Sequence, residues 1–384
     1  MPYIMRLSKK RASLLLVGLC VSALITSCTA WVGSSTSMRL DGMLLRSRSR
    51  GAATLTMDVE TPSRDAAFLQ KHQVSFRSDS NGRSMSHKIS IPRPQEQEQH
   101  DDESVEKAER SHGMPWKTSI DPTYTEDSLF YMQFWEYQMT FMKKHLTNLR
   151  AIPVTSGDKD MSYIENTDKK IRMHTCAFQS DEYKCIRMTV YDAGNATQVF
   201  TSLWYPDPSY NLPVLGIDLL QFNKKKHLCI VDFQPIQSSE HEHDQSYEHL
   251  LQPIRDQYES LQGRMTPRFY DENQFFSKQM LFGRHDATEK NPADKMVFQE
   301  LLPAFQSYVQ THVDLVQSTT GQADRIPAVL ERHAAYDSYS AVRDPAHALL
   351  ARSFGQEWAD NYVFDVLFPS SQRPSKNERM HSSP

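Results

Sequence analysis

The chain has 384 residues, of which 39% are hydrophobic and 23% charged, enough apolar material for a sizeable folded core. Its formal net charge of -4 shows no basic surplus, so the composition does not suggest a nucleic-acid partner. The five cysteines include no close pair, which argues against a zinc or iron–sulfur centre.

Two targeting segments in series occupy the first 57 residues. Basic residues precede an apolar run at 14–25, which is short for a bilayer span and typical of a signal peptide, here 1–28. Residues 29–57 are rich in Ser and Arg with Asp41 as their only acid, as in a transit peptide. We therefore expect import into a plastid (chloroplast) bounded by extra membranes, and no membrane association of the mature chain. A lipoprotein cleavage site at Cys28 is the rival interpretation, but it leaves the Arg- and Ser-rich stretch unexplained.

The remainder of the chain divides by composition into three parts. Residues 58–115 are polar and charged with few core-forming side chains, which predicts a disordered linker. Residues 116–368 carry most of the aromatic and branched apolar side chains and should form one domain, expected to be monomeric. The Pro- and Ser-rich residues 369–384 should form a disordered tail.

The domain is predicted to begin with a helix that is capped by Asp127 or Ser128 and ends before Pro153. Strands are predicted next, at 172–178, 183–191, 198–204, 214–222 and 228–233. A hairpin turn at Gly194 joins the second strand to the third. The apolar period then becomes helical, at 253–261, 272–281, 296–316, 345–354 and 357–367. Helices before and after an antiparallel meander predict an α+β fold with the sheet between helices.

Asp218 is the first candidate catalytic residue, because it interrupts the otherwise apolar strand 214–222. With a period of two, Asp218 shares a face with Val214 and Leu220, and both faces of this strand look covered. A carboxylate that loses its hydration has a raised pKa, which suits it to donate a proton at neutral pH. The alternative is a structural aspartate that caps or pairs with a neighbour.

Several common kinds of site lack support in the sequence. No two of the 13 glycines stand within two residues of each other, which removes the glycine-rich loops that bind dinucleotides and phosphates. No Gly-x-Ser-x-Gly elbow is present, so acyl transfer is not indicated. The cluster of acids and histidines at 240–244 could bind a metal, but its polar surroundings favour a solvated loop, and we expect no metal site.

Asp344 is the second candidate acid. It precedes Pro345 at the start of a predicted helix, where an aspartate commonly caps the first turn. From the residues alone, capping is the better-supported role.

The ordered segments of the domain resemble the ferredoxin-dependent bilin reductases. In the first half these segments are 198–206 (QVFTSLWYP), 212–219 (LPVLGIDL) and 231–235 (VDFQP). In the second half they are 268–277 (RFYDENQFFS), 281–284 (LFGR), 344–346 (DPA), 354–358 (FGQEW) and 367–368 (LF). The similarity covers about 128–368. Residues 215–218 and 269–272 look closest to the members that reduce 15,16-dihydrobiliverdin to phycoerythrobilin.

This resemblance implies a three-layer α/β/α sandwich that holds an open-chain tetrapyrrole between the sheet and the C-terminal helices. It implies no bound flavin, metal or nicotinamide. Electrons would come singly from reduced ferredoxin to the bilin, and protons would come from Asp218 as central donor and Asp344 on the opposite side of the pigment. Thr201 stands where the four-electron members carry a catalytic histidine, so a two-electron reduction is expected.

Binding residues are also implied by the matching stretches. Three arginines are candidates for the substrate's propionates, namely Arg264, Arg268 and Arg284. A basic rim should meet acidic ferredoxin, and the candidates are Lys224, Lys225 and Lys226, with Lys143 and Lys144 beside them. The alternative, which is the commoner case for such side chains, is that they are solvated on the surface.

The leading hypothesis is therefore the two-electron reduction of 15,16-dihydrobiliverdin to phycoerythrobilin in phycobilin biosynthesis. A preceding bilin reductase would then pass on the intermediate. The alternatives are the reduction of biliverdin to 15,16-dihydrobiliverdin, and a bilin-binding carrier without redox activity. Both candidate acids are present, which weighs against the carrier.

Overall fold

The computed structural model describes residues 101–110, 112, 114, 117–236, 244–265, 270–271 and 273–373, all within one of the chain's two units, residues 64–384. The predicted targeting segments, residues 58–100 of the predicted linker, residues 240–243 and Arg268 lie outside the described residues. Within the described ranges no helix is both long and apolar enough to cross a membrane.

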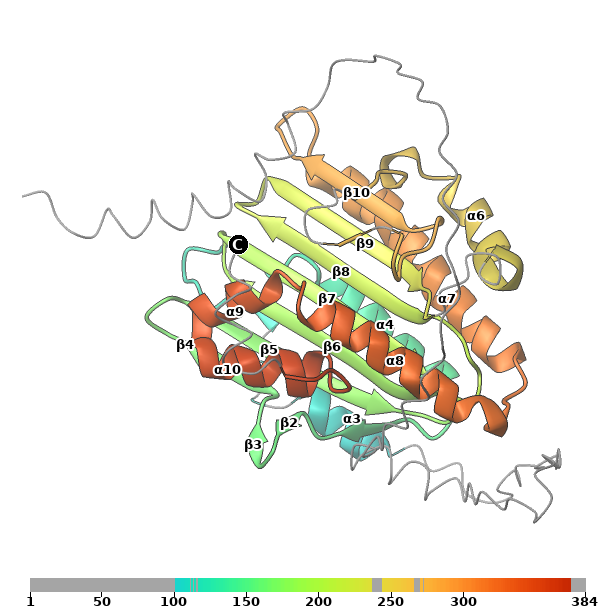
Figure 1. The fold of residues 1–384 in the computed structure, drawn as a ribbon. Helices are drawn as coiled ribbons and strands as arrows, with labels where there is room; N and C mark the ends of the chain where they lie inside the picture. Colours follow the sequence, from blue (N-terminus) through green and yellow to red (C-terminus); the bar gives the residue numbers. More distant parts are fainter. Residues whose placement is uncertain are drawn as a thin grey trace, which may run out of the picture. The chain divides into compact units, whose positions relative to one another are not determined.

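The centre of the domain is an eight-stranded sheet in which every pair of neighbours is antiparallel (Figure 1). The strand order is β1-β5-β6-β7-β8-β9-β10, and β4 also pairs with β5. The bounds are β1 (Arg150–Ile152), β4 (Tyr163–Asn166), β5 (Ile171–Gln179), β6 (Tyr183–Ala193), β7 (Thr197–Pro206), β8 (Val214–Phe222), β9 (Lys226–Gln234) and β10 (Leu281–Asp286). A separate two-stranded ribbon joins β2 (Thr155–Ser156) to β3 (Lys159–Asp160). The predicted five-strand meander is confirmed as β5 to β9.

Helices cover both faces of this sheet. The α-helices are α3 (Asp102–Glu109), α4 (Met132–His145), α6 (His249–Arg255), α7 (Leu302–Ser318), α8 (Ile326–Ala341), α9 (Ala346–Phe354) and α10 (Gln356–Asn361). Shorter π and 3-10 segments are η3 (Asp244–Glu248), η4 (Glu259–Leu261), η5 (Lys295–Leu301), η6 (Ala323–Arg325) and η7 (Tyr362–Leu367).

Two apolar cores separate the three layers. The first packs α4 and α7 on one face of the sheet through side chains such as Trp135, Phe305 and Ile217, all buried. The second packs α8, α9, α10 and η7 on the other face, where Figure 1 shows them in front of the sheet. The expected three-layer α/β/α arrangement is confirmed. Asp218 belongs to the second face, because its neighbours Ile217 and Leu219 point into the first core.

The hairpin between β6 and β7 forms as predicted. Gly194 has φ +59°, a left-handed conformation that glycine adopts without strain, and its N–H donates to the Asp192 carboxylate at 2.8 Å. Asp192 also accepts from Ser119 Oγ at 2.8 Å and from the Ile120 N–H at 2.7 Å. One buried carboxylate therefore fixes the turn to the segment that leads into α4.

Three predicted helical features are wrong. α4 begins at Met132 after Tyr131 without a side-chain cap, so neither Asp127 nor Ser128 caps it. Residues 272–281 form no helix over their described part, because Ser277 donates its N–H and Oγ to Asp232 of β9 at 2.9 and 2.5 Å and Phe275 has φ +62°. The predicted helix 253–261 does not form as one helix: α6 ends at Arg255, and a separate 3-10 turn covers Glu259–Leu261.

The helix α3 lies inside the stretch 58–115 that the sequence predicts as a disordered linker. Val105 on this helix is buried in the first core, with 1% of its surface exposed. Ser104 Oγ accepts from the Ala151 N–H at 3.1 Å, and Cys176 Sγ donates to the Ala108 carbonyl at 3.2 Å. The folded part therefore includes residues from Asp101 onward. At the other end it reaches Ser370, whose N–H donates to Asp337 at 2.9 Å.

Candidate active site

A row of polar side chains crosses the second face of the sheet and ends at Asp218. The strand register places Thr175 opposite Thr189, Thr189 opposite Thr201, and Thr201 opposite Asp218. Directly opposed residues of antiparallel strands point to the same face, so these four side chains lie side by side. Thr201 is thus a direct neighbour of Asp218, as expected for two residues of one site.

The second face of the sheet retains some accessible surface around Asp218. Alternate residues on β7, β8 and β9 that point to the first core are buried. On the second face the residues around Asp218 are only partly buried, whereas others, such as Leu203 and Val214, are buried. Phe222 and Lys226 at the β8–β9 turn are also partly buried on this face. The residues around Asp218 are Val199, Thr201, Asp218, Leu220, Leu228 and Ile230. They form a contiguous patch, because Ile230 lies opposite Asp218 and Leu228 lies opposite Leu220. The patch is apolar apart from Thr201 and the single acid.

The Asp218 carboxyl is surrounded by protein although the residue keeps some accessible surface. Burial raises the pKa of Asp218 to about 8, and the charge of Asp344 raises it as well, while Arg187 opposes both effects. At neutral pH this side chain is mostly protonated. It therefore combines two properties of a proton donor, an available proton and access to a patch on which a ligand can lie.

Asp344 hydrogen-bonds to the start of α9, and its charge raises the pKa of Asp218. Its Oδ1 accepts the N–H of Ala346, the first residue of α9, at 2.8 Å, although the N-cap position itself is taken by Pro345. Burial raises the pKa of Asp344, although the bond from Ala346 and the nearby Arg187 lower it. The two acids that the resemblance indicates therefore belong to one electrostatic unit.

Two further residues of this unit were missed from the sequence. Burial raises the pKa of Tyr270 well above its usual value, and the charges of Asp344 and Asp218 contribute in that order. Its only sequence signal is its place in the segment 268–277. Arg187 on β6 acts on both acids and is buried. The alternation of apolar and polar residues along the strand does not indicate that this arginine is buried.

Tyrosine hydroxyls of the helical layer on the second face form hydrogen bonds to polar side chains of the sheet. Tyr362 of η7 lies 2.9 Å from both Thr175 Oγ1 and Thr189 Oγ1. The hydroxyl of Tyr336 on α8 donates to Gln234 Oε1 of β9. The Gln234 amide lies directly over Gly216, where any Cβ would meet it at 2.5 Å. These contacts set how far the helices stand from the face that carries Asp218.

The predicted arginines are placed unequally. Arg284 on β10 is exposed and lies opposite Leu228, so it points to the same face as the patch. Arg264 follows η4 and is exposed. Arg268 lies outside the described residues. Arg284 is therefore the predicted arginine that the register connects with Asp218.

The three lysines lie at the turn between β8 and β9. Asn223 and Lys224 have φ of 51° and 57°, and this left-handed pair reverses the chain. Lys224 is paired with Glu126 at 3.3 Å and its Nζ lies 5.0 Å from the centre of the Tyr124 ring. Lys225 is exposed and Lys226 is partly buried. Lys143 is paired with Glu109 at 2.9 Å.

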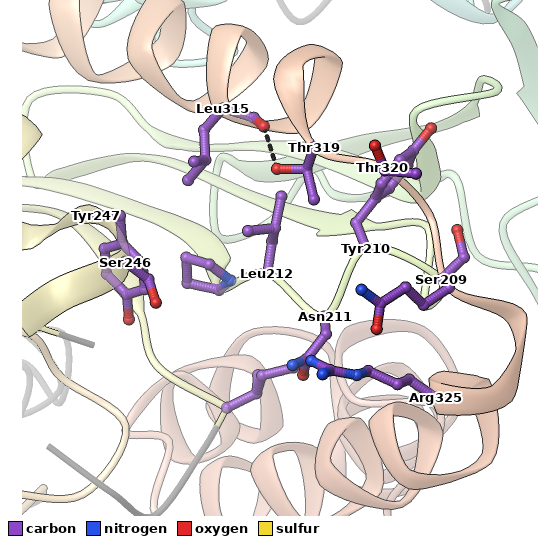
Figure 2. A pocket seen from close by; sticks show the side chains of 13 residues that line it. Ser209, Tyr210, Asn211, Leu212, Ser246, Tyr247, Leu315, Thr319, Thr320 and Arg325 are labelled. Carbon is purple, nitrogen blue, oxygen red and sulfur yellow. Dashed lines mark hydrogen bonds between the residues drawn. The ribbon is translucent and has the colours of Figure 1, made fainter. Parts of the chain in front are cut away.

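A cavity of about 400 Å³ opens elsewhere, where the β7–β8 loop meets the end of α7 (Figure 2). Figure 2 shows Leu212 of the loop lying between Ser246 and Tyr210, and a dashed line marks the bond from Thr319 to the Leu315 carbonyl. That bond measures 2.6 Å. None of the predicted site residues lines this cavity. Within the described ranges no group of three or more His, Cys, Asp or Glu is arranged to hold a metal ion.

Comparison with known proteins identifies the family. Residues 140–369 match the family model described as ferredoxin-dependent bilin reductase. The chain belongs to this family. It is 37% identical over 193 residues to the 15,16-dihydrobiliverdin:ferredoxin oxidoreductase of Nostoc punctiforme, covering 50% of this chain and 76% of that one. It is 36% identical over 223 residues to the protein of the same name from Gloeobacter violaceus, covering 58% and 88%.

A solved structure supports the fold of this bilin reductase. The phytochromobilin synthase of tomato in complex with biliverdin matches with a TM-score of 0.54 and 20% identity, covering 62% of this chain and 83% of that one. The family predicted from the segments between 198 and 368 is thus confirmed, and the chain is an oxidoreductase that depends on ferredoxin. The roles of individual residues remain predictions.

The raised pKa of Asp218 should make folding stability depend on pH. Between its usual pKa of 3.8 and its folded-state pKa of about 8, the folded protein holds a proton that the unfolded chain has released. The wild type should therefore lose stability relative to Asp218→Asn as pH rises across this range, by at most about 1.4 kcal/mol per pH unit. Urea unfolding of both proteins at several pH values measures the difference.

An exposed aspartate provides the control for this pH series. Asp168→Asn removes a carboxylate at the turn before β5 and should leave the pH dependence of unfolding as in the wild type. If the Asp218→Asn curve also ran parallel to the wild-type curve, Asp218 would be an ordinary ionised carboxylate.

Proposed function

We propose that this bilin reductase uses electrons from reduced ferredoxin to reduce biliverdin to 15,16-dihydrobiliverdin. The names of the relatives support this choice, because an oxidoreductase name gives the donor first and 15,16-dihydrobiliverdin is the reduced member of that pair. The sequence favours the next reduction, from 15,16-dihydrobiliverdin to phycoerythrobilin, through residues 215–218 and 269–272. That reaction is the second candidate.

One structural observation carries the proposal: a mostly protonated acid is set in an accessible apolar patch on the sheet. A bilin is a long conjugated molecule with large apolar faces and only a few polar groups. The patch formed by Val199, Leu220, Leu228 and Ile230 offers it apolar contact, while Asp218 offers a proton at the centre. Arg284 lies at the outer side of the patch, where a propionate could extend toward solvent.

The proposed reaction adds two electrons and two protons to one double bond of the pigment. Each ferredoxin gives one electron and is itself oxidised, so the first transfer leaves a bilin radical anion. Asp218 donates a proton to this radical and becomes a carboxylate. A second electron and a second proton complete the reduction, with Asp344 as the proposed auxiliary donor. Solvent protons then restore both acids.

Because the bilin accepts the electrons itself, the proposal includes no resident prosthetic group. A carrier without redox activity would have no use for an acid kept protonated at neutral pH. Asp218 and Asp344 therefore favour catalysis over binding alone. Under the same proposal the protein works in a plastid and releases its product to a subsequent bilin-modifying enzyme.

The activity is tested by anaerobic incubation of the protein with reduced ferredoxin and either biliverdin or 15,16-dihydrobiliverdin, followed by chromatography of the products. We expect biliverdin to be consumed with formation of 15,16-dihydrobiliverdin. Asp218→Asn should still bind the pigment but reduce it about 10²- to 10⁴-fold more slowly, because the general acid is lost.

Asp232→Asn is the matched control for this assay. Asp232 is also buried on the same face, with its pKa raised to about 7, but Ser277 occupies both of its oxygens. This variant should retain turnover under conditions in which it is folded. Reduction of 15,16-dihydrobiliverdin alone would establish the second candidate, and full activity of Asp218→Asn would remove Asp218 from the mechanism.

Ferredoxin is proposed to dock near the turn between β8 and β9. Lys225 has no ion pair among the described residues, unlike Lys224. Lys225→Glu combined with Lys226→Glu should raise the KM for ferredoxin about 10-fold, equivalent to about 1.4 kcal/mol, and weaken its dependence on salt. Lys107→Glu on α3, beside the opposite edge of the sheet, is the control and should leave KM unchanged. An unchanged KM in the double variant would place the docking surface elsewhere.

A further inference from the structure

Arg187 is a buried cation with unused hydrogen-bonding capacity. It lies on β6 with 2% of its surface exposed. Its Nη1 donates to the carbonyl of Leu367 at the end of η7 at 2.8 Å. Its Nε and Nη2 have no hydrogen-bond partner among the described residues, and no carboxylate there forms an ion pair with it. Most of the donor fork is therefore unpaired.

Burying an arginine whose hydrogen-bond donors are mostly unpaired lowers the stability of the folded protein. The guanidinium keeps its charge in proteins, and a buried charge without a paired acceptor is strongly disfavoured. A carbonyl at a helix C-terminus offsets only part of that cost. By contrast, Arg172 on the neighbouring strand is equally buried, but it pairs with Asp192 at 3.3 Å. The missing acceptor at Arg187 therefore points to a ligand.

The position of Arg187 restricts which ligand that is. Arg187 lies opposite Leu203, and Leu203 lies opposite Gly216, so it points to the same face as Asp218 two strands away. Its charge acts on both Asp218 and Asp344. The guanidinium is thus near the acids, but neither acid pairs with it within 4 Å. An anionic or carbonyl oxygen of a molecule bound beside these acids would supply the missing acceptor.

We propose that Arg187 donates hydrogen bonds to a terminal lactam carbonyl oxygen of the bound tetrapyrrole. This inference rests on the proposed function. The exposed Arg284 suits a propionate that reaches solvent, whereas the enclosed Arg187 suits an oxygen at the end of the conjugated system. When one electron enters from reduced ferredoxin, part of the new negative charge resides on that oxygen, where a fixed cation stabilises it. Arg187 keeps its proton throughout, since a guanidinium stays charged in proteins. The proton that is added to a carbon atom of the bilin comes from Asp218.

The test compares Arg187→Gln and Arg187→Lys with the wild type. Turnover of the pigment by Arg187→Gln should fall about 10²- to 10³-fold, as on removal of an oxyanion donor, and its affinity for the pigment should also fall. Arg187→Lys keeps the charge without the planar fork and should be intermediate. Because Arg187 lowers the pKa of Asp218, the pH profile of residual activity should move upward in Arg187→Gln.

Thermal unfolding without pigment separates this role from a structural one. Removal of an unpaired buried charge should leave the melting temperature unchanged or higher, whereas loss of a structural contact lowers it. If Arg187→Gln fails to fold, Arg187→Lys decides: lower turnover at a normal melting temperature supports the proposal, and wild-type turnover overturns it. Wild-type kinetics and pH profile in Arg187→Gln overturn it directly. A wild type inactive on either bilin would instead refute the proposed function.

Discussion

The site depends on one carboxylic acid that the fold keeps out of water. Asp218 occupies an inner strand of an antiparallel sheet, with helices packed against both faces, and burial raises its pKa to about 8. Among the residues that the structure describes, no partner offsets the effect of burial on this carboxyl. A fully apolar strand would be the simpler solution for stability, so the acid indicates a chemical use. Its proton becomes useful because the surrounding patch remains accessible to a ligand.

The third layer completes the site by placing a second acid near Asp218 and a backbone carbonyl against Arg187 of the sheet. α9 brings Asp344 near Asp218, and the end of η7 offers Arg187 a single carbonyl. The helices are held to the sheet through polar contacts, among them Tyr362 with Thr189 and the Tyr336–Gln234 pair. This attachment lets the patch stay open, because the helices do not need to bury it for their own packing. In the proposed reaction, the two acids would supply protons and Arg187 would stabilise negative charge on a pigment that accepts the electrons itself.

The five consecutive strands β5 to β9 were predictable from the sequence, whereas β1, β4, β10 and several contacts that complete the site were not. Apolar runs and turn residues indicated β5 to β9, and the acid in an apolar strand indicated Asp218 before any family was considered. α8 was missed because its inward face is polar: Asp337 is buried with bonds from Tyr205, which lies 132 residues earlier, and from Ser370, 33 residues later. Arg187 was missed for the same reason, since its cover comes from Leu367. Such burial depends on partners that are distant in the chain, and the local periodicity of the sequence carries no information about them.

The protonation state of Asp218 in the pigment-bound protein tests the account most directly. Infrared difference spectra of protein carrying isotope-labelled aspartate, taken against Asp218→Asn, isolate this one carboxyl. The account predicts a protonated carbonyl band at neutral pH that disappears as pH rises through about 8. A spectrum that shows only the ionised carboxylate at and below neutral pH would contradict it.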